Sequence, residues 1–254
     1  MRNRSKVRLV VWNFIEYIAL KYSKFVFLCS KEMKRHYESK YKLELTAKSC
    51  VMPCFNEKDI NEDAFFDGKY DANSFLYVGS LKAWQCFKEI IYVYKKIEQK
   101  SEFPVKLYVY TGQKEEAEKA IKEAGIENYY VGYAKPTQLA QCIRSIKYGF
   151  VIRENVTVNQ VATPTKLSNY LANGIIPIYS SCISDFNSQD MKYRTGIVCD
   201  VDATDEGVER ILGHMKQKIE YEKMREKCKE WFADYYSVDR YIQKIASALK
   251  KCEE

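Results

Sequence analysis

Short apolar runs alternate with amphipathic stretches along most of this chain. The apolar runs, which predict strands, cover residues 25–29, 50–52, 75–78, 105–110, 129–131, 149–152, 175–179 and 196–199. Helical spacing of apolar residues occurs over residues 30–38, 87–99, 114–124, 136–146, 164–173 and, with breaks, from 205 to the end. This order predicts parallel βαβ units in a doubly wound, Rossmann-like α/β sheet. Because the strands are continuous apolar runs, helices are expected on both faces.

Residues 56–73 are acidic and polar and lack periodicity, which is typical of an interdomain linker or a long surface loop. Two strands and two helices precede them, too few for a complete α/β domain. We therefore expect residues 1–60 to be the tail of an incomplete N-terminal domain, 61–73 a linker and 74–235 a complete domain. The amphipathic helix within 236–254 is expected to pack back onto the N-terminal part.

The stretch TPTKLSNYLANGIIPIY, residues 163–179, predicts a helix that opens onto an anion site. Thr163 is a good helix cap, and Pro164 suits the first helical position. The free amides of Thr165 and Lys166 would point out of the helix start, where the helix dipole favours an anion. An exposed lysine is the alternative for Lys166, but the same dipole repels a lysine there. The stretch therefore predicts a diphosphate site.

The end of this predicted helix leads directly into a strand. Gly174 stands where a helix C-terminus favours a left-handed residue. The following run, 175–179, is apolar, but Pro177 cannot donate a backbone hydrogen bond. Pro177 therefore predicts a bulge or a stretch without regular strand pairing.

Composition narrows the classes of function. The net charge is +7, yet no RNP-like motif, zinc finger or arginine-rich arm is present, which argues against nucleic acid. Nine scattered cysteines and two histidines argue for reduced thiols in a cytosolic protein and against a metal site. No apolar run has the roughly 20 residues needed to span a bilayer.

The first predicted helix is rich in aromatic and apolar residues: Trp12, Phe14, Ile15, Tyr17, Ile18 and Tyr22. Basic residues flank it: Arg2, Arg4, Lys6, Arg8, Lys21 and Lys24. This combination suits an anionic membrane surface, which would make the protein peripheral at the inner membrane face. A docked core helix with charged ends is the alternative.

Residues 159–178, NQVATPTKLSNYLANGIIPI, resemble the donor-site motif of GT-B glycosyltransferases of family 4, roughly Pro-x-Lys-x-x-Glu-Tyr-Leu-Ala-x-Gly-x-Pro-Val-Ile. Weaker matches at residues 27–33, 51–56, 75–80 and 131–133 agree in order and spacing. The resemblance implies a retaining transferase that uses a nucleotide-sugar of the UDP or GDP type, without a bound metal or other cofactor. A glycan or lipid-linked acceptor in bacterial capsule or other surface-glycan synthesis is expected.

The resemblance also implies roles for individual residues. Gly79, Ser80 and Lys82 follow the first strand of the donor domain and would contact the phosphates with Thr163, Thr165 and Lys166. Asn169 replaces the family's ribose-binding Glu; it keeps hydrogen-bonding capacity but lacks the charge. Ordinary surface or turn positions remain the alternative for Gly79, Ser80 and Asn169.

Catalytic roles are expected for Arg153, Glu154 and Lys166. Charge develops on the departing diphosphate, and preset cations and amides stabilise it and can replace a metal. Glu154 or Asn155 would face the sugar, although Arg153 and Glu154 could instead pair with each other at the surface.

Three further departures from the family pattern affect the functional prediction. The second Glu of the family's pair would fall near Val161, so that pair is missing. The usual Arg and Lys after the first Gly are absent, and Ser80, Lys82 and Gln85 stand nearby. Most of the acceptor domain is missing as well, so we expect a fragment or a split enzyme completed by a separate acceptor-domain chain. The alternatives are a non-catalytic nucleotide-binding or assembly subunit and a GT-B sugar epimerase.

Overall fold

The computed structural model describes residues 6–253, with side chains described to residue 250. The chain folds into two compact units, divided after Pro53 and again after Ser237. The larger unit is Cys54–Ser237, and the smaller one combines the N-terminal residues with those from Val238 onward. Arg2 and Arg4, expected to flank the first helix, lie outside the described residues.

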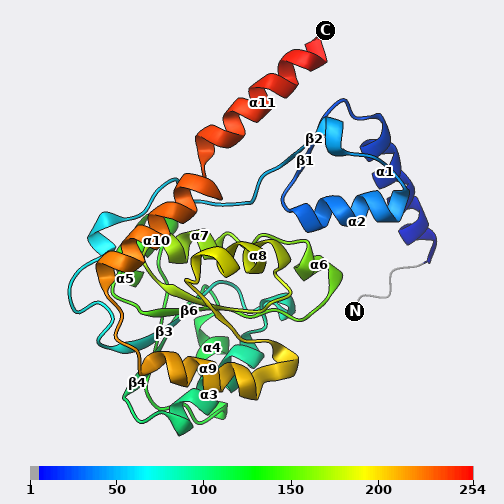
Figure 1. The fold of residues 1–254 in the computed structure, drawn as a ribbon. Helices are drawn as coiled ribbons and strands as arrows, with labels where there is room; N and C mark the ends of the chain where they lie inside the picture. Colours follow the sequence, from blue (N-terminus) through cyan, green and yellow to red (C-terminus); the bar gives the residue numbers. More distant parts are fainter. Residues whose placement is uncertain (1–5, 254) are drawn as a thin grey trace. The chain divides into compact units, whose positions relative to one another are not determined.

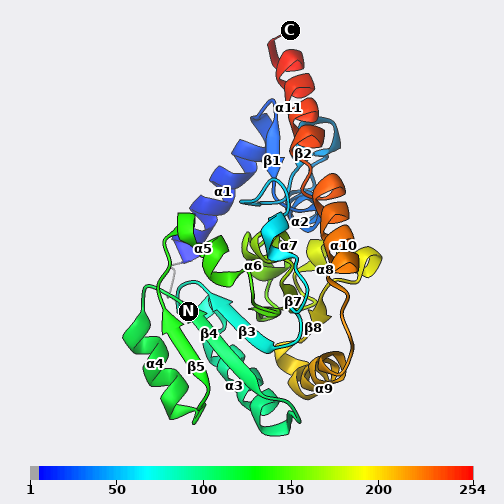
Figure 2. The ribbon, with the colours of Figure 1, turned by 90° about the vertical axis from the view of Figure 1, so that its left-hand side faces the viewer.

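The larger unit contains a six-stranded parallel sheet in the order β5-β4-β3-β6-β7-β8 (Figures 1 and 2). Its strands are β3 (Asn73–Val78), β4 (Val105–Tyr110), β5 (Tyr129–Gly132), β6 (Tyr148–Val151), β7 (Ile176–Tyr179) and β8 (Ile197–Val198). This confirms the predicted doubly wound α/β class. The chain reverses its direction of travel through the sheet between β3 and β6, and crevices at such reversals are the usual ligand sites of open α/β sheets.

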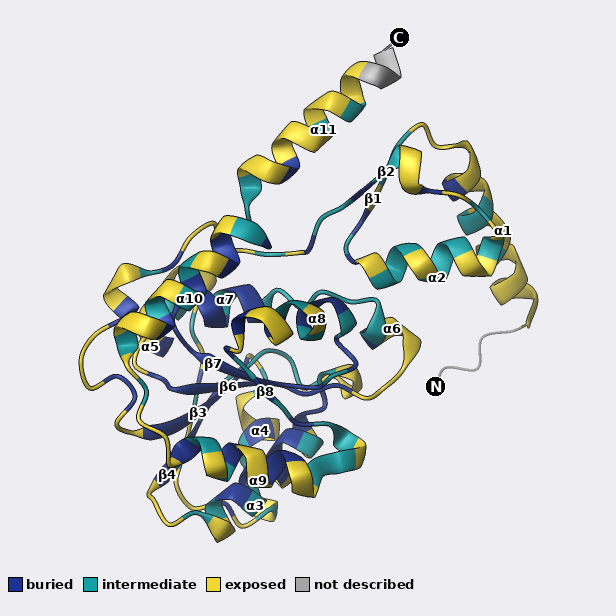
Figure 3. Ribbon diagram, viewed as in Figure 1, coloured by how far each residue is buried: buried dark blue, intermediate teal, exposed yellow. Residues whose placement is uncertain are grey.

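Helices cover both faces of this sheet, as predicted (Figure 1). Its α-helices are α3 (Phe87–Lys100), α4 (Lys114–Glu123), α5 (Pro136–Ile143), α6 (Thr157–Gln160), α7 (Lys166–Ala172), α8 (Ser184–Tyr193), α9 (Thr204–Met215) and α10 (Tyr221–Asp234). Short 3-10 helices are η2 (Glu62–Ala64), η3 (Ala83–Gln85) and η4 (Val201–Ala203). Helices α3 and α9 contact each other on one face, and α7 contacts α10 on the other. The central strands β3, β6 and β7 are almost wholly buried, whereas β5 at the edge of the sheet is partly exposed (Figure 3).

Stacked aromatic rings fix the middle of the sheet. The Phe75 ring of β3 stacks on the Tyr148 and Phe150 rings of β6, with centroid distances of 4.9 and 5.7 Å. All three side chains are fully buried. Large aromatic side chains bury much apolar area, and offset stacking adds to their contribution. The two strands that border the switch point are therefore held rigidly together.

Residues 54–73 are part of the larger unit and pack against its core, whereas the sequence suggested a linker over residues 61–73. Ile60, Ala64, Phe65 and Tyr70 belong to its buried core. Lys69 is also buried, and its ammonium group donates to the carbonyl of Asn173 at 2.8 Å. These apolar residues follow no regular period, because they pack from a segment with little regular structure, so periodicity did not reveal them.

The smaller unit contains α1 (Lys6–Tyr22), β1 (Val26–Leu28), α2 (Lys31–Tyr41), the 3-10 helix η1 (Thr46–Lys48), β2 (Ser49–Val51) and α11 (Val238–Glu253). Strands β1 and β2 pair in parallel, and α11 contacts β2. The Ser30 hydroxyl accepts a hydrogen bond from Met33 N at 2.8 Å and so caps α2. Leu20, Leu28 and Leu45 form a small core. In the described part of the chain, no helix combines the length and apolarity needed to cross a membrane.

Pro177 does not interrupt β7, contrary to the predicted bulge. The register runs without a break from Tyr148↔Ile176 to Val151↔Tyr179. The Ile176 amide donates to Lys147 O on the β6 side, so the alternation of a strand turns the Pro177 nitrogen toward β8. Pairing with β8 begins only at Ile178. Proline therefore removes no hydrogen bond from the sheet.

Candidate functional site

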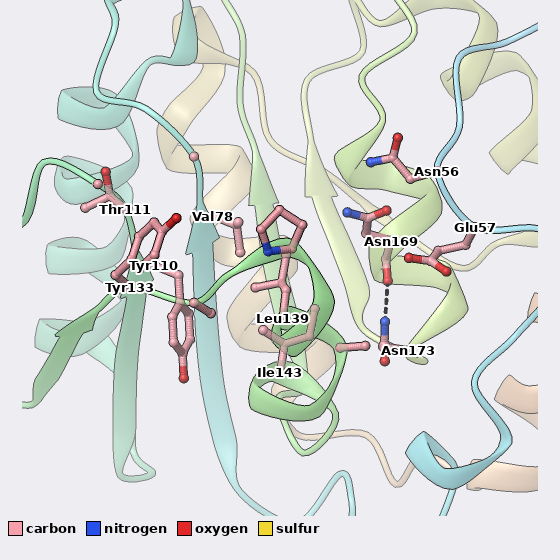
Figure 4. A pocket seen from close by; sticks show the side chains of 15 residues that line it. Asn56, Glu57, Val78, Tyr110, Thr111, Tyr133, Leu139, Ile143, Asn169 and Asn173 are labelled. Carbon is pink, nitrogen blue, oxygen red and sulfur yellow. Dashed lines mark hydrogen bonds between the residues drawn. The ribbon is translucent and has the colours of Figure 1, made fainter.

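A pocket of about 520 Å³ lies beyond the carboxyl ends of β3, β4 and β5. It is lined by Asn56, Glu57, Val78, Gly79, Tyr110, Thr111, Gly112, Tyr133, Ala134, Pro136, Leu139, Ala140, Ile143, Asn169 and Asn173. Figure 4 shows Tyr110, Thr111 and Tyr133 on one side and Asn169 on the other, with apolar side chains of α5 between them. A partly apolar pocket with a few polar groups is typical of a small-molecule site.

Gly79 and Lys166 meet at the edge of this pocket. Gly79 follows β3, and its amide donates to Tyr110 O at 3.0 Å. Its φ is +142°, a conformation that other residues rarely adopt. A Cβ added at Gly79 would lie 2.8 Å from Lys166 Nζ. The absence of a side chain at Gly79 thus gives Lys166 its room.

Two cations share one neutral acceptor beside Gly79. Gln85 Oε1 accepts from Lys166 Nζ at 2.7 Å and from Arg153 Nη2 at 2.8 Å. Arg153 Nη1 also donates to the backbone carbonyl of Ile152 at 2.8 Å. Among residues 6–250, whose side chains the structure describes, no carboxylate forms an ion pair with either cation. Their positive charge is therefore left uncompensated.

Burial makes this uncompensated charge costly. Only 6% of the Arg153 surface is exposed. Burial, and secondarily the neighbouring Arg153 charge, lowers the pKa of Lys166 to about 7. The ammonium group also lies 4.7 Å from the centroid of the Tyr77 ring, whose face attracts a cation. An anion beside these two groups would favour the charged form of Lys166.

Helix α7 begins at Lys166, two residues later than predicted, and no side chain caps it. Thr163 Oγ1 instead accepts from the Cys54 amide at 2.9 Å and so holds the 54–73 segment. The Thr165 carbonyl accepts from the Ser168 hydroxyl at 2.8 Å. The amides of Thr165 and Lys166 donate no hydrogen bond to any other described residue. Thr163 is therefore not the helix cap, and these two amides have no partner among the described residues.

Asn169 carries an unused acceptor at the same pocket. Its Oδ1 is buried and has no hydrogen-bond partner among the residues that the structure describes. Its backbone carbonyl accepts from Asn173 Nδ2 at 2.9 Å, the contact dashed in Figure 4. Because buried polar atoms are nearly always satisfied, a free Oδ1 at a pocket indicates a missing donor.

Other predicted site residues lie outside the cation cluster. Ser80 is held through its carbonyl, which accepts from the Tyr77 hydroxyl at 2.6 Å. Lys82 is exposed, with its ammonium group 5.0 Å from the centroid of the exposed Trp84 ring. Glu154 is exposed as well, and its carbonyl accepts from Asn159 Nδ2 at 2.9 Å. The Asn155 side chain accepts from Gln160 Nε2.

Sequence reasoning did not assign a role to Gln85 or Tyr77. Gln85 stands near the position where the family has Arg and Lys after the first Gly. The absence of those basic residues was the only sequence signal that could have drawn attention to Gln85. Tyr77 lies inside an apolar strand, so nothing in the pattern separated it from core residues. The side chains of residues 6–250 include no group of three or more His, Cys, Asp or Glu that could hold a metal ion.

Comparison with families and curated proteins gives no relative by sequence. No family model matches the chain, and no curated protein matches it significantly.

Solved structures do resemble it. A mutant of S. aureus TarM, solved with fondaparinux, α-GlcNAc-glycerol and UDP, is 10% identical with a TM-score of 0.73; the match covers 93% of this chain and 46% of TarM. WaaG, a glycosyltransferase involved in lipopolysaccharide biosynthesis, is 11% identical with a TM-score of 0.69, and 97% of this chain covers 68% of it. WaaB, a lipopolysaccharide outer core galactosyltransferase, is 18% identical with a TM-score of 0.65. The match covers 91% of this chain and 62% of WaaB.

This chain thus spans about half the length of TarM. At sequence identities this low, structural similarity establishes the fold but not the activity. The chain has the fold of the GT-B glycosyltransferases, as the donor-site resemblance predicted.

Proposed function

We propose that the chain is a nucleotide-sugar-dependent glycosyltransferase, or the donor half of one, and that Arg153 and Lys166 hold the donor's diphosphate. The observation that carries this proposal is the pair of uncompensated cations on Gln85, beside Gly79 at the carboxyl ends of the strands. Ligands of open α/β sheets bind at this place. The amides of Thr165 and Lys166 would add donors to the same anion.

The proposed chemistry follows from the charge of the leaving group. Breaking the sugar–phosphate bond places negative charge on the departing diphosphate. Cations fixed in a partly buried site stabilise that charge strongly, because little solvent screens them. Lys166 and Arg153 would thereby take the part that a metal has in other transferases. We propose transfer with retention of configuration, as the donor-site resemblance implies, and an NMR assignment of the product anomer would test this.

The donor would be of the UDP or GDP type. The pocket offers Tyr110, Leu139 and Ile143 as apolar surface for a nucleoside, and Asn169 Oδ1 as an acceptor for a ribose hydroxyl. TarM was solved with UDP, and a trehalose-6-phosphate protein from E. coli with UDP-2-fluoro glucose. The relation to lipopolysaccharide transferases supports a glycan or lipid-linked acceptor in bacterial surface-glycan synthesis, on the cytoplasmic side of the membrane.

Calorimetric titration with UDP-, GDP- and CMP-sugars tests the donor site. One of these should bind, and Lys166→Ala should weaken its binding by about 1.5–3 kcal/mol, the scale of a hydrogen bond to a charged group. Lys88→Ala removes an exposed lysine of α3 and serves as the matched control. If no nucleotide-sugar binds to the folded protein, or if Lys166→Ala binds as tightly as wild type, the proposal is wrong.

A second candidate is a non-catalytic nucleotide-binding or assembly subunit of a split glycosyltransferase. The surface of the smaller unit favours it. Leu20 is the only buried residue of α1, whereas Trp12 and Phe14 are 54% and 63% exposed. A helix that is apolar on all sides is normally covered. The two-stranded parallel sheet β1–β2 is also smaller than parallel sheets usually are, so a separate α/β acceptor domain could cover α1 and extend the sheet.

Two measurements separate this candidate from the first. Sugar transfer by the purified chain alone would exclude a non-catalytic subunit. Co-sedimentation with vesicles of anionic phospholipid tests whether α1 instead binds a membrane surface, for which its flanking lysines and arginines are suited. Replacing Trp12 and Phe14 with serine should abolish vesicle binding if the membrane is the partner. The same replacement should leave nucleotide-sugar binding unchanged.

A further inference from the structure

Gln85 lies at the centre of the cation cluster. Its Oε1 accepts from Arg153 Nη2 and Lys166 Nζ, and its backbone carbonyl accepts from Arg153 Nη1 at 3.3 Å. These partners come from the end of β6 and the start of α7, which are distant in the sequence. Gln85 is thus the residue through which the two cations are joined.

Hydrogen bonds fix the loop that leads to Gln85. The Tyr77 hydroxyl holds the Ser80 carbonyl, and the Leu81 amide donates to Gln113 Oε1 at 2.8 Å. The 3-10 helix η3 ends at Gln85, and Cys86 follows in a left-handed conformation with φ of 53°. The side-chain amide of Gln85 therefore projects from a rigid backbone, as an accurately positioned binding group requires.

A neutral acceptor has a particular effect at this place. A buried and a half-buried cation held this close repel each other, and without a shared acceptor they would move apart or lose a proton. A carboxylate would hold them more strongly, but it would also neutralise the charge that attracts an anion. The Gln85 amide holds both groups and leaves their charge in place. The resemblance leads one to expect Arg and Lys after Gly79, whereas here an uncharged residue positions cations from two other elements.

We infer that Gln85 is a positioning residue that holds Arg153 and Lys166 for a diphosphate and keeps the site cationic by being uncharged. The inference rests on the proposed function, since it deepens the same anion site. It predicts that charge at position 85, and not only the ability to accept hydrogen bonds, determines anion affinity.

Gln85→Glu is the decisive variant because it keeps shape and acceptor but adds a negative charge. Binding of inorganic pyrophosphate and of UDP should weaken roughly 10- to 100-fold, the scale of a lost charged interaction. The melting temperature should stay equal or rise, because the new carboxylate pairs with the cations of Arg153 and Lys166. Gln138→Glu adds the same charge at an exposed position of α5 and is the control.

Gln85→Met removes the side-chain acceptor and keeps a side chain of similar length. Pyrophosphate binding should weaken here too, but with a lower melting temperature, since the cations lose their shared partner. If wild type binds pyrophosphate and UDP and Gln85→Glu binds them equally well, the inference is overturned, but the proposed function is not. Weaker binding together with a lower melting temperature in Gln85→Glu also overturns the inference, because Gln85 would then be a structural residue. If wild type binds neither ligand, the proposed function fails as well.

Discussion

The ammonium group of Lys166 lies too close to Gly79 to leave room for a side chain there. A Cβ built on Gly79 comes within 2.8 Å of Lys166 Nζ and 3.0 Å of its Cε. The two residues belong to the loop after β3 and the first turn of α7. Their contact couples the backbone at the switch point of the sheet to the position of a half-buried cation. The site therefore depends on a missing side chain as much as on a charged one.

Gly79→Ala should displace Lys166 and strain the backbone. We expect pyrophosphate affinity to fall roughly tenfold or more, since a charged contact is lost. Stability should fall by about 1–3 kcal/mol, because a φ of +142° is unfavourable for alanine. Calorimetry and denaturant unfolding measure the two effects. Gly213→Ala is the control, since an added Cβ there meets nothing within 4 Å; wild-type affinity in Gly79→Ala would contradict the steric coupling.

The pH dependence of donor binding should report the Lys166 proton. Its pKa of about 7 in the free protein means that the cation is partly lost above neutrality. Affinity for a UDP-sugar, whose diphosphate keeps its charge near neutral pH, should be constant below about pH 7. Above it, affinity should fall by up to about tenfold per pH unit, because binding requires uptake of a proton.

Lys166→Arg provides the matched comparison, because arginine keeps its charge throughout this range. Its affinity for the UDP-sugar should be flat from about pH 7 to 9. Lys88→Ala should show the wild-type slope. Identical slopes for wild type and Lys166→Arg would show that another group controls the pH dependence.

The same proton should affect folding stability with the opposite trend. The pKa of Lys166 falls from its ordinary 10.5 to about 7 on folding. Below about pH 7 both states bind the proton, and the folded state bears the full cost of burying it. Between the two pKa values only the unfolded state holds the proton, so stability rises with pH. Lys166→Met should therefore exceed wild type in stability near pH 6, by on the order of 1–3 kcal/mol.

This advantage of Lys166→Met should shrink steadily toward pH 10. Lys69 and Lys147 also have lowered pKa values, about 7 and 8, but both proteins contain them and their effects cancel in the difference. Urea unfolding of the ligand-free proteins across this range measures the difference. A stability difference that does not change with pH would mean that Lys166 is not buried as a cation.

Much of the fold could be predicted from the sequence, because buried parallel strands are apolar runs between turns. Strand β4 has the predicted bounds, and the other strands differ by a few residues at their ends. Helix α8 was not predicted. Its buried face includes Asp185 and Asp190, and Asp190 accepts from the Thr195 amide at 2.8 Å. A helix that buries carboxylates carries no clear apolar stripe, so its pattern did not reveal it.

The candidate site was only partly predictable. Lys166, Arg153, Gly79 and Asn169 could be named from a motif and from their places at strand ends. Their arrangement around Gln85 could not, since it joins residues 68 and 81 positions apart. The supposed cap Thr163 binds Cys54 N, a partner 109 residues away. Such contacts depend on how the elements pack and leave no local pattern.

Asn169 allows the nucleoside part of the site to be tested separately from the phosphates. Its buried Oδ1 has no partner in the described part of the chain and is available to a ribose hydroxyl. Asn169→Ala should weaken UDP binding by about 1 kcal/mol, roughly fivefold, the net value of one hydrogen bond. Pyrophosphate has no ribose, so its affinity should not change.

Asn169→Glu places a carboxylate where the donor-site resemblance leads one to expect it. A charged acceptor forms stronger hydrogen bonds than an amide, so UDP should bind at least as tightly as to wild type. Calorimetric titration of wild type and both variants with UDP and pyrophosphate completes the comparison. Equal weakening of UDP and pyrophosphate in Asn169→Ala would place Asn169 at the phosphates or in the fold. A selective loss of UDP would instead fix the ribose beside α7, with the diphosphate pointing toward Lys166.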